Sequence, residues 1–542
     1  MIRRRGLLKG VATAGLNRAT SLTRATVLAQ AVTLARPALA GDSKTLSIVP
    51  QATLNSVDPI WSTSQVSRNL GFMVFEPLYG RDANGVPQAQ MVGSDLMEDG
   101  GRRWTMQLRP GLLFHDGEPV RAKDCVASLW RWLKRDTVGV TLTARLDSLE
   151  ATDDRTIVWR LSKPFPHMRA LLSKVVQPVV MMPERVARTD PFKQIAEVVG
   201  SGPFRWLADE HVLASHAGFA RFEAYVPRDE PPSYMAGGHR VLLDKVEWKM
   251  IPDAGTAANA LLTGEIDWIE IPLPDLLGML RKALGVKTGV LDKAGQIMML
   301  RPNHLIAPTN LAAVRQTMLA AISQAEVVSA VMGADPANGT SGVGFLTSGN
   351  PEIDDAGLEV IRKRHTRDEV KAMLDKSGYA GEKLVLLHAT DHIFFNPMGA
   401  VVANMLTNAG MAVDDQAMDW PTVQTRRVSK EPLDKGGWSM FPSLVAVTEY
   451  RDLLLTGFMR GNGRDGWFGW PSDPRMEEIY DTWLGTEDAS QQTELEREYE
   501  LEGLRSLPFI PLGRFRQTSA WRANVIGMLD GPSVIFWNVT KS

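Results

Sequence analysis

Hydrophobic residues recur along the chain at two spacings, and each spacing is typical of one kind of secondary structure. A spacing of two residues predicts strands at residues 45–50, 103–108, 157–161 and 246–250. A spacing of three to four residues predicts two helices, which carry Val66, Leu70, Met73 and Val74 in the first and Val126, Leu129, Trp130 and Leu133 in the second. The pieces between about residues 85 and 195 together form a small α+β unit.

From about residue 300 the pattern changes, because helices now alternate with single strands. Strands are expected at 383–387 and 411–418, with a helix at 397–409 between them. Such alternation predicts an α/β lobe. The apolar run at 508–512 contains two prolines, which would be unusual in the centre of a sheet.

Several helix starts are marked by capping residues. Thr366 and Glu369 have the spacing of a capping box. Asp253 and Asn310 each stand where an N-cap is expected before an apolar helical pattern. These residues therefore predict where three of the helices begin.

The first forty residues have the order of an export signal. Arg3, Arg4 and Arg5 precede a weakly apolar stretch that ends in the cleavage pattern Ala38-Leu39-Ala40. Adjacent arginines resemble a twin-arginine address, but Arg18 and Arg24 interrupt the apolar stretch, so the Sec and twin-arginine routes both stay open. An uncleaved amphipathic tail is the alternative to a signal peptide over residues 1–40.

Charge and composition exclude several classes of partner. The leader holds seven basic residues and no acidic ones, so its removal takes the net charge from −2 to −9. A protein this negative is expected to bind neither nucleic acid nor anionic lipid surfaces. No later stretch reaches the ~18 consecutive apolar residues of a membrane span. The single cysteine, Cys125, cannot form an internal disulfide.

The order of short motifs resembles a known family. The motifs are Val57-Asp58-Pro59, the run from Trp104 to Gly117 followed by Ala122-Lys123-Asp124, Gly200 to Phe204, Gly264 to Trp268, Val314 to Gln316, and Pro471 to Pro474. They are similar to those of the extracytoplasmic solute-binding proteins of peptide-type and nickel-type ABC importers, family 5. The resemblance runs from about residue 44 to the C-terminus.

The resemblance implies an α/β, two-lobed periplasmic-binding-protein-like fold of class II, with an additional α+β subdomain on lobe I. Lobe I would span residues 41–300 and include the inserted subdomain 85–195. Lobe II would span 301–505, and residues 506–542 would return to lobe I. Two crossings, at 298–303 and 506–512, would act as the hinge.

Aromatic and hydroxyl residues gather where the family places its ligand cleft. The candidate ligand-binding residues are Trp61, Ser62, Thr63, Trp420, Phe441, Ser443, Trp467 and Trp470. Aromatic rings suit such a site because each offers a large, rigid face at little entropic cost. Ordinary core or surface packing is the alternative for each of them taken singly.

The loop after the strand through Trp438 differs from the family pattern. Peptide-binding members carry an aspartate there that pairs with the ligand's α-ammonium group, whereas residues 441–448 contain no carboxylate. Burying an ammonium without an ion partner is costly. A capped, cyclic or largely apolar ligand is therefore expected, unless Glu449 or Asp419 supplies the charge.

Other chemistries find little support in the sequence. The chain lacks the common nucleophile-elbow, phosphate-loop and zinc-protease motifs, so we expect no enzyme and no cofactor, and a secreted hydrolase is a weak alternative. His388 and His392, with Asp391 beside them, could contribute to a metal site, but no third ligand stands at a diagnostic spacing. Nickel or metal-chelate binding is kept as the alternative within the family.

The sequence thus predicts an exported, soluble, monomeric periplasmic protein that binds a small organic or peptide-like ligand by hinge closure. The resemblance implies that it delivers this ligand to the permease subunits of an ABC importer, which separate ATPases drive. Ligand identity and the permease-docking surface stay open.

Overall fold

Two large β-sheets organise the computed structural model, which describes residues 44–333 and 338–542. The predicted leader lies outside the described residues. Within the described ranges, no helix is both long and apolar enough to cross a bilayer.

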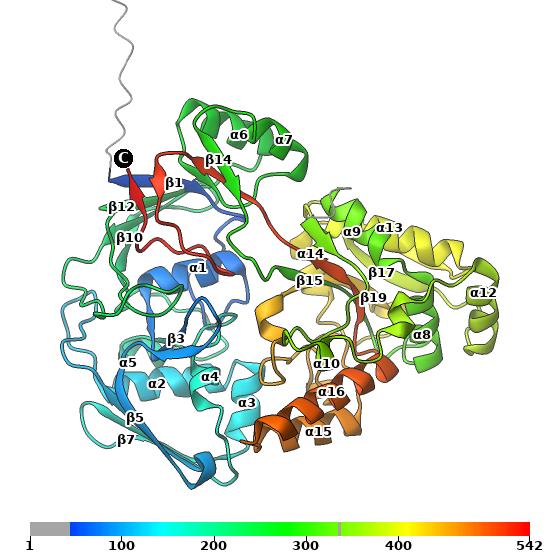
Figure 1. Cartoon of the computed structure of the whole chain (residues 1–542), viewed down its shortest axis with the longest axis horizontal. Coiled ribbons are helices and arrows are strands. Elements are labelled where there is room, and N and C mark those ends of the chain that lie inside the picture. The colour runs from blue at the N-terminus through cyan, green and yellow to red at the C-terminus, as the bar shows by residue number, and fades with distance from the viewer. Residues whose placement is uncertain (1–43, 334–337) are drawn as a thin grey trace, which may run out of the picture. The chain divides into compact units, whose positions relative to one another are not determined.

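The sheet of lobe I has seven strands in the order β10-β11-β12-β1-β13-β21-β14. Its strands are β1 (Thr45–Val49), β10 (Phe204–Val212), β11 (His216–Arg221), β12 (Lys245–Lys249), β13 (Trp268–Ile269), β14 (Val286–Gly289) and β21 (Ser519–Arg522). The predicted first strand, β1, lies at the centre and pairs in parallel with β12 and β13. Helices α1 (Gln65–Val74), α6 (Ala254–Thr263) and α7 (Leu277–Leu280) accompany this sheet (Figure 1).

The sheet of lobe II has six strands in the order β16-β20-β15-β19-β17-β18. Its strands are β15 (Gln296–Pro302), β16 (Gly339–Thr340), β17 (Leu384–Ala389), β18 (Val413–Met418), β19 (Met440–Ala446) and β20 (Ile510–Phe515). Pro511 is tolerated because the short β16 pairs with Arg514 and Phe515, so within the described residues no strand pairs with β20 on that side at Pro511.

The helices of lobe II are α8 (Ala312–Ala321), α9 (Gln324–Met332), α10 (Pro351–Asp354), α11 (Glu359–Arg362), α12 (Arg367–Lys376), α13 (Phe395–Asn408), α14 (Trp420–Arg426), α15 (Pro474–Leu484) and α16 (Ala489–Ser506). Helices α9 and α13 contact each other, α9 also contacts β20, and α13 also contacts β17. Helices α15 and α16 pack side by side (Figure 1).

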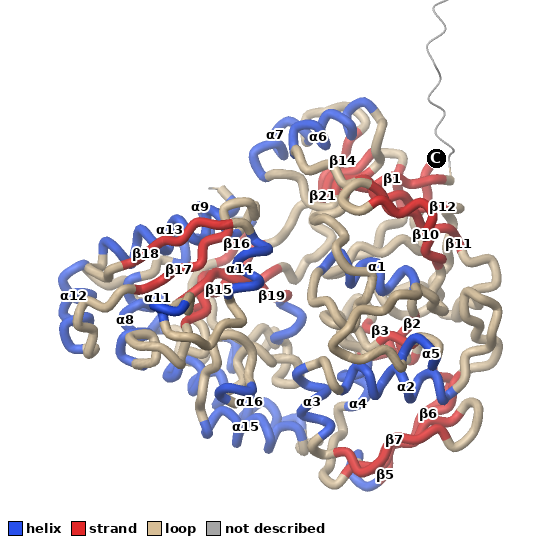
Figure 2. Tube along the Cα trace, turned by 180° about the vertical axis from the view of Figure 1, so that it is seen from behind, coloured by secondary structure: helices blue, strands red, loops and turns tan. Residues whose placement is uncertain are grey.

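The inserted subdomain has its own antiparallel sheet, in the order β5-β6-β8-β7. Its strands are β5 (Val92–Glu98), β6 (Arg103–Leu108), β7 (Leu146–Ala151) and β8 (Thr156–Leu161), and its helices are α2 (Ala122–Leu133), α3 (Thr137–Thr143), α4 (Met168–Leu172) and α5 (Glu184–Ala187). Helix α2 contacts β7 and β8, and Figure 2 shows it lying along the side of the subdomain sheet that carries β7. Cys125 is buried in this helix. Short two-stranded pairs complete lobe I: β2 (Glu76–Pro77) with β9 (Val180–Met181), β3 (Tyr79–Arg81) with β4 (Pro87–Ala89), and β22 (Val525–Ile526) with β23 (Thr540–Lys541).

The chain crosses between the two large sheets at residues 290–295 and 516–518, between β14 and β15 and between β20 and β21. The predicted crossings at 298–303 and 506–512 are therefore wrong in position. Their residues lie in or beside β15 and β20, which are buried strands of the lobe II sheet that pair with each other.

Capping residues set two of the three predicted helix starts. Asp253 accepts a hydrogen bond from the Thr256 amide, and Thr366 and Glu369 form a reciprocal capping box. The prediction for Asn310 is wrong, because its amide bonds to Ile306 in a turn and α8 begins after Leu311.

The inserted subdomain also contacts lobe II. Arg145 forms an ion pair with Asp481 on α15, and Lys163 lies 3.3 Å from the same carboxylate. The His167 ring stacks on Trp483, with 4.2 Å between ring centroids and 9° between planes. Just before the inserted subdomain, the carbonyl oxygen of Asn84 in the turn between β3 and β4 accepts a hydrogen bond from the Arg451 guanidinium of lobe II.

Candidate functional site

Four aromatic rings surround the guanidinium of Arg427, the residue that follows α14. Its central carbon lies 5.2 Å from the Trp420 ring, 5.9 Å from Phe441, 5.7 Å from Trp467 and 4.7 Å from Phe468. We call these five residues the Arg427 cluster. The sequence predicted three of its rings, Trp420, Phe441 and Trp467, as ligand-binding residues, and the structure brings them together.

Arg427 carries a charge that the described part of the chain leaves uncompensated. Burial lowers its pKa to about 10, and no carboxylate offsets the effect. The Nε atom is buried without a hydrogen-bond partner. A desolvated guanidinium presents a fork of donors that fits carboxylates, so the cluster is suited to an anionic group flanked by apolar surface.

A second arginine holds the loop that carries Trp467 and Phe468. Arg301, on β15, is fully buried. Its Nε donates to the Phe468 carbonyl oxygen at 2.5 Å, and its Nη1 donates to the Phe458 carbonyl oxygen. The guanidinium also lies 5.0 Å from the Trp467 ring. Arg301 therefore positions one side of the Arg427 cluster.

The start of α14 fixes Trp420 beside a histidine. Asp419 caps the helix by accepting from the Thr422 amide, and the Trp420 amide donates to Asp391 at 2.7 Å. The Trp420 ring lies 4.6 Å from the Phe395 ring and 5.9 Å from His392. Because Asp419 is an exposed helix cap, it does not supply the charge that residues 441–448 lack.

The remaining predicted residues lie outside the Arg427 cluster. Trp61 packs against the inserted subdomain, where its Nε1 donates to the Phe192 carbonyl oxygen at 3.3 Å. Ser62 and Thr63 follow it on the way to α1. Ser443 is buried within β19, and Trp470 is buried with its ring 5.6 Å from Trp438.

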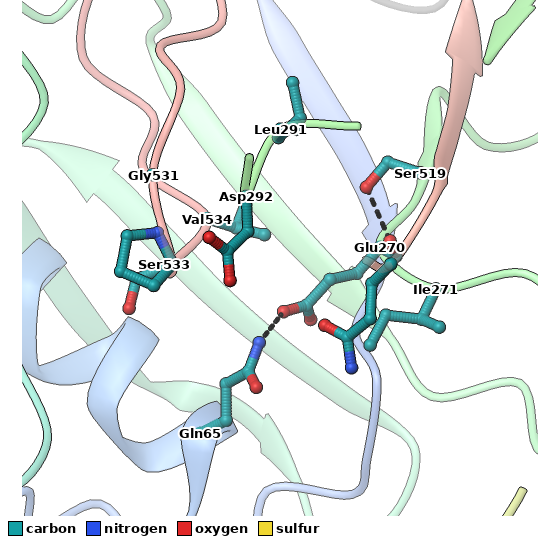
Figure 3. A pocket seen from close by; sticks show the side chains of 11 residues that line it. Gln65, Glu270, Ile271, Leu291, Asp292, Ser519, Gly531, Ser533 and Val534 are labelled. Atoms are coloured by element: carbon teal, nitrogen blue, oxygen red, sulfur yellow. Dashed lines mark hydrogen bonds between the residues drawn. The ribbon is translucent and has the colours of Figure 1, made fainter. Parts of the chain in front are cut away.

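A cavity of ≈ 30 Å³ lies in lobe I, where the chain crosses to lobe II (Figure 3). It is lined by Gln65, Glu270, Ile271, Leu291, Asp292, Gln517, Ser519 and residues 531–534. The carboxylates of Glu270 and Asp292 and the amide of Gln65 point toward one another in this cavity. We call it the acidic cavity.

Both carboxylates of the acidic cavity are buried and hydrogen-bonded. Glu270 accepts from Gln65 Nε2 at 3.0 Å, from Asn69 Nδ2 at 3.0 Å and from the Gln51 amide at 2.8 Å. Asp292 Oδ1 accepts from the amides of residues 294 and 295 at 3.1 and 3.0 Å. Burial raises the pKa of both carboxyl groups, because the surroundings disfavour their charged forms.

Asp292 lies close to the end of β19, the position where the sequence analysis found no carboxylate. The Val447 amide donates to the Gly295 carbonyl oxygen, and the Gly295 amide in turn donates to Asp292. Glu449 is also buried nearby, within electrostatic reach of Lys174, Arg81 and Arg68. A ligand without an ammonium group stays a prediction, and its stated exception, a charge supplied by Glu449, has a second candidate in Asp292 from another segment.

The histidines considered for metal binding are occupied by other partners. His388 Nδ1 lies 2.9 Å from Asp415 Oδ1, and its Nε2 lies 2.9 Å from the Asn396 carbonyl oxygen. His392 stacks on Phe395, and burial lowers its pKa to about 4. In the described ranges, one group has metal-like spacing, Glu210, His216 and Glu247, and Lys245 already bridges its two glutamates.

Sequence reasoning missed Arg427 and the acidic cavity. Arg427 stands next to Arg426 in a polar stretch, and nothing in the sequence separates a paired arginine from an unpaired one. Arg426 does bond to Gln416 at 2.6 Å. The acidic cavity draws residues from segments more than 200 positions apart, which only the fold brings together.

Comparison with known proteins relates this geometry to a family. Residues 87–456 match the bacterial extracellular solute-binding proteins, family 5, middle part. The chain is 31% identical over 544 residues to a probable peptide ABC transporter periplasmic-binding protein, y4tO, of Sinorhizobium fredii. That alignment covers 100% of both chains.

Two solved structures share the fold. AgaA from A. tumefaciens R10, in complex with agropinic acid, has a TM-score of 0.78 at 20% identity and covers 92% of this chain and 99% of its own. DppA from Helicobacter pylori, in complex with the peptide STSA, has a TM-score of 0.77 at 18% identity and covers 92% and 98%. The predicted two-lobed α/β fold is thereby confirmed.

Proposed function

The chain belongs to the bacterial extracellular solute-binding proteins of family 5, the substrate-binding components of ABC importers, and we propose that it captures a carboxylate-bearing, peptide-like solute on Arg427. This family consists of transport proteins rather than enzymes. The resemblance found in the sequence is therefore confirmed at the level of the family.

One observation carries the proposed ligand chemistry. Arg427 has no carboxylate partner in the described chain, yet four aromatic rings shield it. Keeping a guanidinium desolvated without a counter-charge destabilises a protein. A ligand carboxylate would supply that counter-charge, and the rings would contact the apolar part of the same ligand.

The names of the related proteins are consistent with a peptide-like solute, but they do not identify a particular one. The full-length relative is named for peptide transport, and the two structural neighbours hold a peptide and agropinic acid. We propose that the protein works as a monomer in the periplasm and delivers its ligand to a permease with associated ATPases.

Hinge closure accounts for capture. A ligand that contacts both lobes has differential affinity for the closed state and shifts the equilibrium toward it. The two crossings, at 290–295 and 516–518, are the segments whose backbone would absorb this motion.

Calorimetry on the purified protein tests the role of Arg427. With peptides from a panel of di- to pentapeptides, Arg427→Met should weaken binding at least tenfold, because the ligand carboxylate loses its partner. Arg427→Met should leave the melting temperature unchanged or raise it, since it removes a half-buried guanidinium that has no carboxylate partner in the described chain. Trp420→Ala and Trp467→Ala should each weaken binding by more than ~1 kcal/mol.

Arg426→Gln is the matched control, because it removes one positive charge from the same helix end outside the cluster. Wild-type affinity in Arg427→Met would refute the proposed carboxylate site. Co-purified solute identified by native mass spectrometry would supply the natural ligand for the same titrations.

A further inference from the structure

A groove with a volume of ≈ 450 Å³ runs along helix α2 of the inserted subdomain. One wall is α2 itself and the other is formed by α5 and the segment after it, and these two helices lie side by side (Figure 2). All lining residues fall between positions 123 and 191, so the inserted subdomain forms the groove without either large sheet. Its volume lies within the range of about 300–1,000 Å³ that is usual for small-molecule sites. We call it the α2 groove.

Helix α2 has apolar residues on two of its faces. One face, with Leu129 and Trp132, is fully buried in the core of the subdomain. Val126, Ala127 and Trp130 form a second apolar strip, which lines the groove and is half-buried. A surface helix ordinarily carries polar residues away from the core. The second strip therefore offers a contact surface for the apolar part of a guest.

The charges that line the groove leave a positive surplus. The Glu184 carboxylate pairs with Arg188 at 2.6 Å and with Lys123 at 3.5 Å. Lys134 is exposed and forms no ion pair among the residues that the structure describes. Three cations thus share one carboxylate, and the surplus is concentrated at the Lys134 end. The carboxylates of the neighbouring turns do not line the groove; they belong to Asp153, Asp154 and Asp190.

Arg131 adds no free charge but holds the walls of the groove together. Its guanidinium is paired with Asp58 at 2.7 Å. Its Nε also donates to the Thr189 carbonyl oxygen at 3.3 Å, and its Nη2 donates to the Lys193 carbonyl oxygen at 2.9 Å. These bonds tie α2 to the segment that forms the opposite wall. The groove is therefore preformed, and a guest pays little for ordering it.

Size, apolar surface and charge together select the guest. We propose that the α2 groove binds a small aliphatic monocarboxylate, with its carboxylate at Lys134 and its chain along Val126, Ala127 and Trp130. An inorganic anion would leave the apolar strip uncovered, and a neutral or cationic chain would leave Lys134 without a counter-charge. The strip and Lys134 together cover eight residue steps, about 12 Å of helix. A chain of medium length fits this distance.

This inference is independent of the proposed function, because no lining residue belongs to the Arg427 cluster or to either crossing between the lobes. The Arg427 cluster could also attract a carboxylate with an apolar chain. All titrations are therefore made in the full-length Arg427→Met variant, in which that attraction is removed.

Calorimetry with three probes tests the chemistry of the guest. Octanoate carries both the chain and the charge, octan-1-ol carries the chain alone, and acetate carries the charge alone. We expect octanoate to bind saturably at one site. Octan-1-ol and acetate should each bind at least fivefold more weakly, because each lacks one of the two contacts.

Variants then assign the binding to the α2 groove. Lys134→Met removes a cation that has no ion pair in the described chain, so it should fold normally. It should weaken octanoate binding at least fivefold and leave octan-1-ol binding unchanged. Ala127→Trp should weaken both, because the larger ring fills the groove. Lys371→Met, which removes an exposed lysine from α12 in lobe II, is the matched control and should bind octanoate as the background variant does.

The outcomes that would overturn the inference are distinct. Unchanged octanoate affinity in Lys134→Met, or equal affinities for octanoate and octan-1-ol, would show that Lys134 does not hold a carboxylate. Equal losses in Lys134→Met and Lys371→Met would reduce the effect to overall charge. Binding to phosphatidylglycerol vesicles without binding of free octanoate would replace the small acid with a membrane surface. None of these results changes the peptide titrations of the wild type, which decide the role of Arg427 separately.

Discussion

Glu496 is a buried carboxyl group, and among the residues that the structure describes its side chain accepts one hydrogen bond, from the Trp483 indole at 3.0 Å. Burial raises its pKa to about 8, with the nearby Asp452 charge acting in the same direction. The folded protein therefore keeps a proton that the unfolded chain, with a pKa near its ordinary value of 4.5, gives up. The stability contributed by this proton is complete below about pH 4.5 and is lost as the pH rises through about 8.

Glu496→Gln should remove this pH dependence, because glutamine is neutral and can still accept from the indole. Relative to the variant, the wild type should lose a few kcal/mol between pH 5 and 8. Urea unfolding midpoints at several pH values measure the difference. Glu494→Gln, on an exposed position of the same helix, is the control, and a parallel pH profile in wild type and Glu496→Gln would contradict the prediction.

At the same scale, the sequence indicated aromatic candidates for the ligand site more readily than charged ones. Trp420, Phe441 and Trp467 could be named because large aromatic rings suit ligand contact wherever they stand. Arg427 and Asp292 could not, because their roles depend on which partners are missing around them. Which partners surround a charged residue is decided only when the fold brings distant segments of the chain together.

At the scale of elements, the spacing of hydrophobic residues predicted strands and helices well wherever a stretch of the sequence followed a single spacing throughout. Strand β6 has the predicted bounds, 103–108, because its buried and exposed residues alternate. Helix α16 escaped prediction because its buried face includes Glu496 and Glu500, so the apolar stripe is interrupted. The two crossings between the lobes were predicted at the wrong residues. The reason is that the sequence of an apolar strand such as β15 does not indicate which of the two large sheets the strand joins.

The segment before α1 depends on one buried ion pair. Asp58 and Arg131 lie at 2.7 Å with side-chain exposures of 0% and 1%. Asp58 also accepts from the amides of Ile60, Trp61 and Ile195. It therefore ties the Val57-Asp58-Pro59 motif to α2 of the inserted subdomain.

Asp58→Ala should destabilise the fold by about 3–5 kcal/mol, because Arg131 would be left buried without its partner. Chemical denaturation of wild type and variant measures the loss. Breaking the exposed pair between Arg103 and Glu98 by Glu98→Ala should cost less than ~1 kcal/mol. Similar losses in the two variants would show that burial does not set the strength of these pairs.

On the scale of the whole molecule, the inserted subdomain and lobe II form a contact away from the Arg427 cluster. Arg145 is nearly buried and pairs with Asp481, while His167 stacks on Trp483. Contacts across lobes favour whichever state contains them. We expect this contact to contribute to the closed state.

Asp481→Asn should weaken ligand binding about fivefold, because the closed state loses an ion pair worth on the order of 1 kcal/mol. Calorimetry gives the affinity, and small-angle scattering gives the radius of gyration with and without ligand. Asp434→Asn, an exposed carboxylate on lobe II outside this contact, should bind as the wild type does. An unchanged affinity in Asp481→Asn would mean that the contact is equally present in the open state.

Cys125 is the single cysteine of the sequence, is fully buried in α2, and has a pKa raised by burial, so its thiolate is scarce. Maleimide dyes and spin labels should therefore leave the natural protein unmodified. Pairs of cysteines introduced on the rims of the lobes could carry a donor and an acceptor fluorophore without any prior removal of a native thiol. The molecule is thus a ready scaffold for a reagentless optical sensor of whatever nutrient it captures.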